Sequence, residues 1–149
     1  MTKSKLLILA AAPALVLCSC AKKCSFADFQ KAVGEIKESP KITEVTIKGF
    51  IKAEGEELKV GKTTLKVDSM PSDEEAMKAA MLFEMVYQVK IGYFALAEDE
   101  NAKYYAGSSF KVKTENVTYE WDEYGNCTSI EGEEDGEEVD ISCKYTYAE

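Results

Sequence analysis

The chain has 149 residues, of which 46% are hydrophobic and 30% charged, and its formal net charge is −9. This length suffices for one domain with a substantial core, and the acidic charge argues against binding to nucleic acid or to an anionic lipid surface. The chain has no histidine, and all 18 of its basic residues are lysines. Because imidazole is the commonest general base near neutral pH and guanidinium the usual clamp for phosphate and carboxylate, we expect a protein that is not an enzyme and that holds no cofactor or metal.

The first twenty residues follow the pattern of an export signal. Two lysines precede an apolar run at residues 6–17, and small residues follow that run. Pro13 and the shortness of the run argue against a stable membrane span, which needs about 20 residues. The pattern predicts export, and it leaves two alternatives open, an ordinary signal cleaved after Ala21 and an uncleaved anchor.

The end of this segment, Leu17-Cys18-Ser19-Cys20, resembles the processing motif of bacterial lipoproteins. In that motif a Leu and two small residues precede the cysteine that receives the lipid. Ser19 fits as the small residue beside the cut, whereas Cys18 departs from the usual small residue. The resemblance implies that residues 1–19 form a signal peptide and that acyl chains such as palmitate are attached to Cys20.

Such a modification would hold the protein to a membrane through the lipid on Cys20, at the extracytoplasmic face, either on the cell surface or in the periplasm. Residues 20–24 would then be the lipid anchor and a short tether, and residues 25–149 would form a single domain. Loss of Lys3 and Lys5 with the signal would change the formal net charge from −9 to −11.

A short helix is expected at the start of this domain. Ser25 and Asp28 have the spacing of a capping box, and the apolar residues that follow recur at helical spacing. Pro40 cannot continue a helix, so the pattern predicts a helix over residues 26–38.

Two strands are expected next. From Ile42 apolar residues alternate with polar ones, which is typical of a strand, and residues 53–56 have the composition of a turn. The run after the turn changes parity at Gly61-Lys62. The change indicates either a β-bulge at Gly61 or a small extra hairpin, and the sequence does not decide between them.

The clearest helix start is at Pro71, with Ser72 as the expected N-cap and Glu75 closing a capping box. A largely apolar sequence follows, which predicts one long helix to about Glu98 with a possible break at Gly92.

Three methionines recur at every fourth position of this helix, namely Met77, Met81 and Met85. They are predicted to lie between the helix and the sheet, either as ordinary core residues or as the lining of an adaptable apolar groove, since methionine repacks around varied ligands. Copper(I) capture by the thioethers is a weaker third hypothesis.

The remaining sequence reads as an antiparallel meander of four strands, at residues 104–113, 117–121, 127–131 and 137–147. Together the elements predict an α+β fold in which a curved antiparallel sheet of about six strands packs against one short and one long helix. The layout loosely resembles half-barrel lipoproteins and periplasmic lipoprotein carriers. That resemblance implies a hydrophobic cleft between the helices and the concave face of the sheet.

An acidic run at residues 131–138 lies between the last two predicted strands. Carboxylates are calcium ligands, but the spacing is not that of a known calcium loop. A solvated hairpin tip that discourages aggregation of strand edges is the preferred interpretation.

After lipidation of Cys20 the domain keeps Cys24, Cys127 and Cys143, an odd number, so at least one of them has no partner within the chain. Export permits disulfide formation. If residues 134–136 form a three-residue loop, Cys127 stands directly opposite Cys143, within bridging distance.

A two-residue loop at Asp135-Gly136 instead pairs Ile130 with Ile141. The sequence therefore leaves a Cys127–Cys143 disulfide and two small, buried thiols equally open.

These patterns lead to two hypotheses for function. The first is a non-enzymatic module that binds a hydrophobic ligand between the long helix and the sheet, with Met77, Met81 and Met85 in the site. The alternative is a structural or protein-interaction module with no small-molecule ligand. An open apolar cleft would favour the first hypothesis, and a closed interface between helix and sheet the second.

Overall fold

The structure, a computed structural model, describes residues 21–149, so the signal peptide and Cys20 lie outside the described residues. Its helices and strands are, in chain order, β2 (Lys22–Cys24), α1 (Phe26–Gly34), β3 (Ile42–Ala53), β4 (Glu56–Lys66), α2 (Glu74–Tyr87), α3 (Ile91–Phe94), β5 (Lys103–Ala106), β6 (Phe110–Lys113), β7 (Val117–Trp121), β8 (Cys127–Glu134) and β9 (Glu137–Tyr147).

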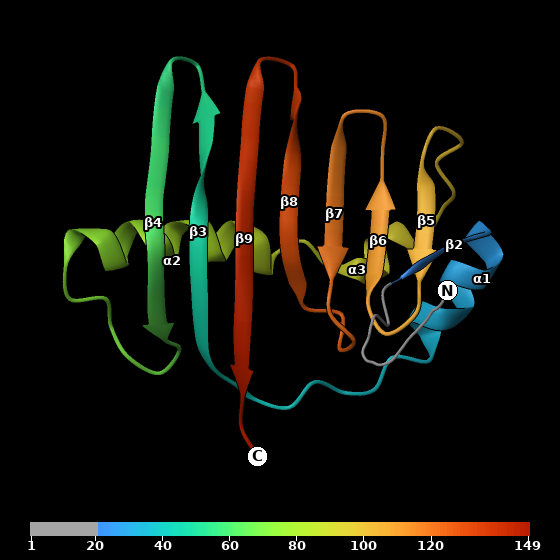
Figure 1. The fold of residues 1–149 in the computed structure, drawn as a ribbon, viewed down its shortest axis with the longest axis horizontal. Helices are drawn as coiled ribbons and strands as arrows, with labels where there is room; N and C mark the ends of the chain where they lie inside the picture. The colour runs from blue at the N-terminus through green and yellow to red at the C-terminus, as the bar shows by residue number, and fades with distance from the viewer. Residues whose placement is uncertain (1–20) are drawn as a thin grey trace, which may run out of the picture.

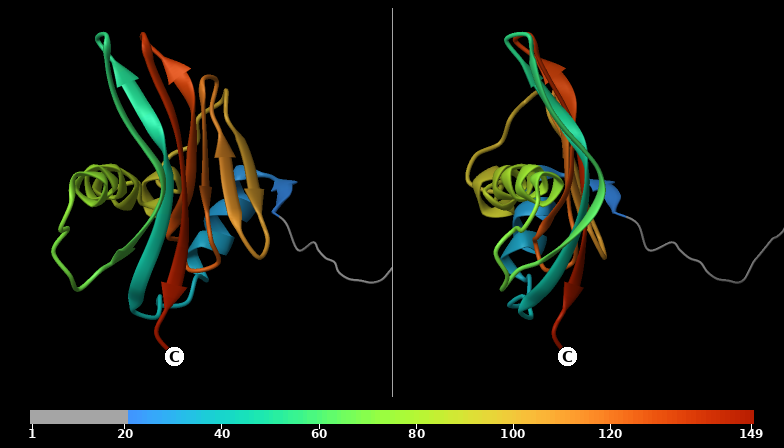
Figure 2. Two further views of the ribbon diagram at one scale, coloured as in Figure 1. Left: turned by 60° about the vertical axis from the view of Figure 1, so that its left-hand side comes forward. Right: turned by 90° about the vertical axis from the view of Figure 1, so that its left-hand side faces the viewer.

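Eight antiparallel strands form one curved, open sheet in the order β2-β5-β6-β7-β8-β9-β3-β4. The helices all lie on its concave side, with α2 crossing the strands of one half and α1 and α3 covering the other half (Figure 1, Figure 2). The predicted α+β fold with a curved antiparallel sheet is confirmed. The expected number of about six strands is too low.

Two short strands account for the difference. Residues 22–24, predicted to be a tether, form β2 and pair with β5 at one edge of the sheet. The segment 104–113, predicted to be one strand, turns at residues 107–109 and forms both β5 and β6. Strands of three or four residues contain too few alternations of polar and apolar residues to be recognised by periodicity.

The first helix begins as predicted and ends early. Ser25 is the N-cap, and its side chain accepts a hydrogen bond from the Asp28 backbone N–H at 3.1 Å. The helix ends at Gly34 rather than at residue 38, because glycine favours the end of a helix over its interior.

The pairing of β3 with β4 distinguishes the two alternatives for Gly61-Lys62, a β-bulge or a small extra hairpin. Ile47 pairs with Thr63 and Gly49 with Val60, so Lys48 alone faces two residues of β4. The parity change is therefore a β-bulge at Gly61-Lys62 and not an extra hairpin.

The single long helix predicted to reach Glu98 is wrong, because the structure has α2, a break at residues 88–90, and the four-residue helix α3, which contains Gly92. The N-cap of α2 is Asp73 and not Ser72, and its carboxylate accepts from the Ala76 N–H at 2.7 Å. At the break, the carbonyl of Val89 accepts the indole N–H of buried Trp121 at 2.9 Å.

That hydrogen bond gives a physical reason for the break. A buried indole N–H needs an acceptor, and an unbroken helix would use the Val89 carbonyl internally.

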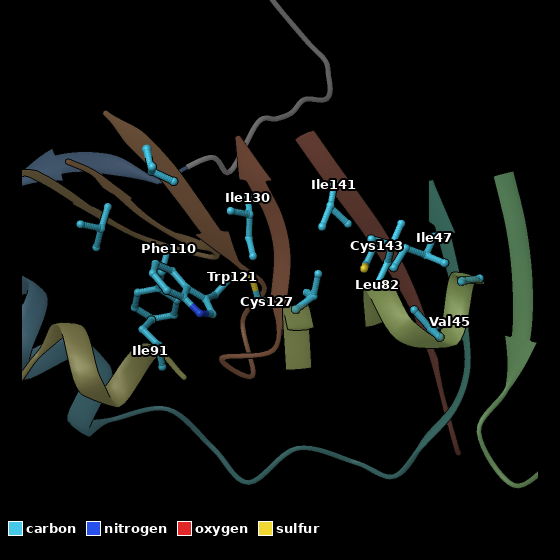
Figure 3. Packing of buried hydrophobic residues seen from close by; sticks show 14 of the residues in the cluster. Val45, Ile47, Leu82, Ile91, Phe110, Trp121, Cys127, Ile130, Ile141 and Cys143 are labelled. Carbon is cyan, nitrogen blue, oxygen red and sulfur yellow. The ribbon is translucent and has the colours of Figure 1, made fainter. Parts of the chain in front are cut away.

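The core between helices and sheet contains Phe29 of α1, Leu82 and Val86 of α2, and Trp121 of β7, all fully buried. Figure 3 shows strand side chains converging on Leu82 and on Ile91 of α3. Aromatic rings fill the part under α1 and α3. The ring pairs there include Phe26–Tyr104, Phe29–Tyr104, Phe29–Phe110, Phe94–Tyr119 and Phe94–Trp121.

Candidate binding groove

The candidate site exists because α2 is too narrow to cover the full length of the strands that it crosses. β3 has 12 residues and β9 has 11, which corresponds to roughly 35–40 Å of extended chain. A helix with its side chains is only about 10 Å wide. Figure 1 shows the far ends of β3, β4, β8 and β9 extending well beyond α2.

Strand register places two rows of residues on the concave face beyond the helix. In one row the directly paired residues are Val117, Gly132, Val139, Ile51 and Leu58. In the next, closer to α2, they are Tyr119, Ile130, Ile141, Gly49 and Val60. Both rows are apolar across five strands, so this part of the concave face is hydrophobic without being fully covered.

Two glycines interrupt these rows, and the close approach of neighbouring strands requires them. Gly49 has φ +135°, and a Cβ there would lie 2.0 Å from the carbonyl oxygen of Asp140. Gly132 has φ +156°, and a Cβ would lie 2.2 Å from the carbonyl oxygen of Asn116. Neither position can carry a side chain without displacing backbone, so the rows keep two gaps in their side-chain layer.

A groove of about 260 Å³ lies along these rows beside α2. Eight apolar residues line it. Met85 of α2 and Val89 in the segment after α2 lie on the helix side, and the sheet contributes Ile51, Val117, Tyr119, Ile130, Val139 and Ile141. The remaining two lining residues are Glu134 and Glu137.

These two glutamates form a directly opposed pair across the β8–β9 hairpin. The turn between them is Asp135-Gly136, in which both residues have positive φ, as in a two-residue hairpin turn. None of the four ion pairs found within residues 21–149 involves either glutamate. Like charges directly opposed on a sheet are destabilising, so the hairpin carries an uncompensated negative pair at the groove.

The pKa of the Tyr119 hydroxyl is affected both by its apolar surroundings and by this negative charge. Burial raises the pKa of its hydroxyl above the ordinary value, and the carboxylate of Glu134 raises it further. The Tyr119 side chain is therefore a neutral, protonated lining residue across the physiological pH range.

Other hollows flank the opposite side of α2. One of about 370 Å³ lies between α2, β4 and the loop that joins them, and its lining mixes Val67, Met70 and Phe83 with serine, threonine and lysine. Another, of about 360 Å³, shares Val67 and Phe83 with it. The first of these has four polar lining residues beside its eight apolar ones, twice as many polar residues as the groove beside Met85, so we take the groove beside Met85 as the candidate site for an apolar ligand.

Two of the three methionines are not where the sequence predicted them. Met77 and Met81 are 57% and 58% exposed on the outer side of α2, so their prediction in the helix–sheet interface is wrong. Met85 is 38% exposed and lines the groove. The side of α2 that faces the sheet instead presents Ala79, Leu82 and Val86. Spacing by four keeps residues on one helix face but does not tell which face is buried.

The cysteines follow the second of the two predicted registers. Ile130 pairs with Ile141, as expected for a two-residue turn, and Cys24, Cys127 and Cys143 are all free thiols. Of the two registers left open, the structure does not have the one that sets Cys127 opposite Cys143, and it has two buried thiols in place of a disulfide.

Both buried thiols are held in the protonated form. Burial raises the pKa of Cys127 to about 12, and the thiol lies 3.6 Å from the Ser129 carbonyl oxygen, to which it donates. Burial, followed by the nearby Cys127, raises the pKa of Cys143 to about 12. Because the thiolate is the nucleophile, neither cysteine is suited to covalent chemistry.

A polar cluster at the other end of the sheet fixes the C-terminal strand. The Asp122 carboxylate accepts from the Tyr147 hydroxyl and from the backbone N–H groups of Tyr124 and Asn126. Asn126 also donates to Ser39 and to the Tyr147 hydroxyl. Two of these contacts tie the turn after β7 to Tyr147 of β9, one ties it to the segment after α1, and two lie within the turn, so the cluster has a structural explanation.

Within residues 21–149 no group of three or more Asp, Glu or Cys side chains is placed to hold a metal ion. None of the helices between Ala21 and Glu149 is long and apolar enough to cross a membrane. No protein-family model, no curated protein and no solved structure matches the chain.

Proposed function

We propose that this protein is a non-enzymatic binding module that holds a hydrophobic ligand in the groove between α2 and the far ends of strands β3, β7, β8 and β9. The observation that carries the proposal is the groove of about 260 Å³ with eight apolar lining residues. Ligand sites are typically concave and mostly apolar, with a few polar groups that fix orientation. Met85 is the one methionine of the three that contributes to this site.

The proposed setting is the outer face of a membrane, with acyl chains on Cys20. Cys20 is bonded to Ala21, one residue before β2 begins, so the lipid would be attached directly at the edge of the sheet. Two or more acyl chains give lasting attachment where one is marginal. Replacing Cys20 with Ala should release the protein from membranes or stall its precursor, and unchanged fractionation with a normally processed N-terminus would contradict the anchor.

The groove is tested by filling it. Val139→Trp places a large side chain in the groove from the inner face of β9, whereas Asp140→Trp places the same side chain on the outer face one residue away. We expect Val139→Trp to abolish binding of the neutral dye N-phenyl-1-naphthylamine and Asp140→Trp to leave it intact. Equal dye binding by the two folded variants would contradict the proposed site.

A second candidate, a protein-interaction module, is supported by a different set of residues. Five large apolar side chains on the helix side are more than half exposed, namely Met70, Met77, Met81, Tyr93 and Leu96. Isolated exposed apolar residues are common, but several on one side indicate an interaction surface. Native mass spectrometry of detergent-extracted protein separates the two candidates, because it detects either a co-purified small ligand or a co-purified protein.

A further inference from the structure

We infer that the ligand of the groove is a single-chain amphiphile with a cationic head group, held with its alkyl chain along the apolar rows and its head between Glu134 and Glu137. This inference rests on the proposed function and specifies its ligand class. It follows from the size of the groove and from the charges at its end.

The size favours one alkyl chain. Sites for drug-sized ligands usually enclose about 300–1,000 Å³, and this groove, at about 260 Å³, lies just below that range. The lining is apolar from Met85 and Val89 on the helix side to Val139 and Ile51 on the sheet. A two-chain lipid would leave much of its apolar surface in water, whereas one chain can lie along the rows.

The charge favours a cationic head. Glu134 and Glu137 are the only charged residues among those that line the groove, which includes no lysine. They lie on the inner face of the hairpin whose tip extends beyond α2 (Figure 1). A cation between them would relieve the repulsion of two directly opposed carboxylates, and an anionic head would add a third negative charge.

The outer face of the same hairpin provides a contrast. Glu133 and Glu138 are also directly opposed, but there Lys52 of β3 pairs in register with Glu138. Lys52 makes its ion pair with Glu57 of β4 at 3.8 Å. The outer pair thus has a lysine on the neighbouring strand without an ion pair to it, and the inner pair has no lysine in the lining of the groove. The two pairs carry the same charge on opposite faces, so the outer pair is a matched control.

The test compares three ligands with the same ten-carbon chain and different heads, decyltrimethylammonium, 1-decanol and decanoate. Each is titrated against the mature protein loaded with N-phenyl-1-naphthylamine, below its critical micelle concentration or, for decanol, below its solubility limit. We expect decyltrimethylammonium to bind about tenfold more tightly than decanoate, with decanol between them. The preference should shrink in 0.5 M salt, because exposed charges are screened.

Two double variants test whether the preference for a cationic head group comes from Glu134 and Glu137. Glu134→Gln with Glu137→Gln should remove the preference for the cationic head, and Glu133→Gln with Glu138→Gln should preserve it. Both variants remove two negative charges from one hairpin, so a general effect of net charge would change them equally.

The outcomes separate this inference from the proposed function. If the three ligands bind equally, or if both double variants lose the preference to the same extent, the head-group inference is overturned and the groove still binds apolar chains. If none of the three displaces the dye, or if the dye itself does not bind, both the inference and the proposed function are overturned.

Discussion

The two ends of the sheet differ in how strand length compares with helix width. At one end β5 and β6 have four residues each, roughly 13 Å of chain, which is close to the width of one helix. At the other end β3 and β9 are almost three times as long and are crossed by α2 alone (Figure 2). The short-strand end can therefore be covered completely, and the long-strand end cannot.

Burial follows from this difference. At the short-strand end Phe29, Tyr104, Phe110 and Trp121 are buried under α1 and α3, with rings packed against one another. At the long-strand end Ile51, Leu58 and Val139 share the same concave face but stay partly exposed. One sheet thus combines a closed aromatic core, which stabilises the fold, with an open apolar surface available for binding.

The largest effect is expected at the closed end. Phe29→Ala should lower the free energy of unfolding by about 3–5 kcal/mol, because Phe29 is fully buried against Tyr104 and Phe110. Urea denaturation measures the change. A loss below about 1 kcal/mol would mean that α1 does not close this end of the core.

Alkaline pH should have the next largest effect, and it acts on Cys127 of β8 and Cys143 of β9. Burial raises the pKa of Cys127 and of Cys143 to about 12, whereas in the unfolded chain a thiol titrates near 8.5. The folded state therefore keeps protons that the unfolded state loses. Stability from these thiols is fully present below about pH 8.5 and is lost as the pH rises toward 12.

The expected slope near pH 10 is roughly 1.4 kcal/mol per pH unit for each thiol. Urea denaturation at pH 8 and pH 10 measures it, and Cys143→Ala serves as the control because it should remove about half of the slope. The same pKa values predict that iodoacetamide leaves both thiols of the folded protein unmodified at pH 8. Rapid modification, or a Cys127–Cys143 disulfide in non-reducing peptide mapping, would contradict the free, buried thiols.

The sequence predicted those parts of the fold that local patterns specify. The alternation in residues 137–147 gave β9 with its bounds, and Ser25 gave the start of α1. Patterns of three or four residues were too short to show β2 or to divide β5 from β6. The break after α2 depends on the indole of Trp121, which lies 32 residues away in the chain and leaves no local signal at Val89.

The site was harder to predict than the fold. A groove between a helix and the sheet was expected, but two of its three predicted methionines face outward, because a largely apolar helix does not reveal which side packs. The residues that line the groove come from five segments that only strand register brings together. Glu134 and Glu137 were interpreted only as part of a solvated tip, since their inward direction depends on a two-residue turn that the sequence left open.

A smaller effect is expected at the open end. Ile51→Ala should cost about 1 kcal/mol, because its side chain is only partly buried and water already reaches the groove that it lines. The same substitution should weaken dye binding, since it removes apolar surface from the site. A loss as large as that of Phe29→Ala would show that the long-strand end is closed in solution.

The smallest effect is expected on the outer side of α2, where two neighbouring residues give a direct comparison. Met81 is 58% exposed and Leu82 is fully buried, although the two are adjacent in one helix. Met81→Ala should change the free energy of unfolding by less than about 0.5 kcal/mol, because alanine is the better helix former and little apolar contact is lost. Leu82→Ala should cost about 2–5 kcal/mol in the same urea titration. If Met81→Ala lowers the free energy of unfolding as much as Leu82→Ala does, then α2 turns a different face to the sheet, and the groove beside Met85 would have a different lining.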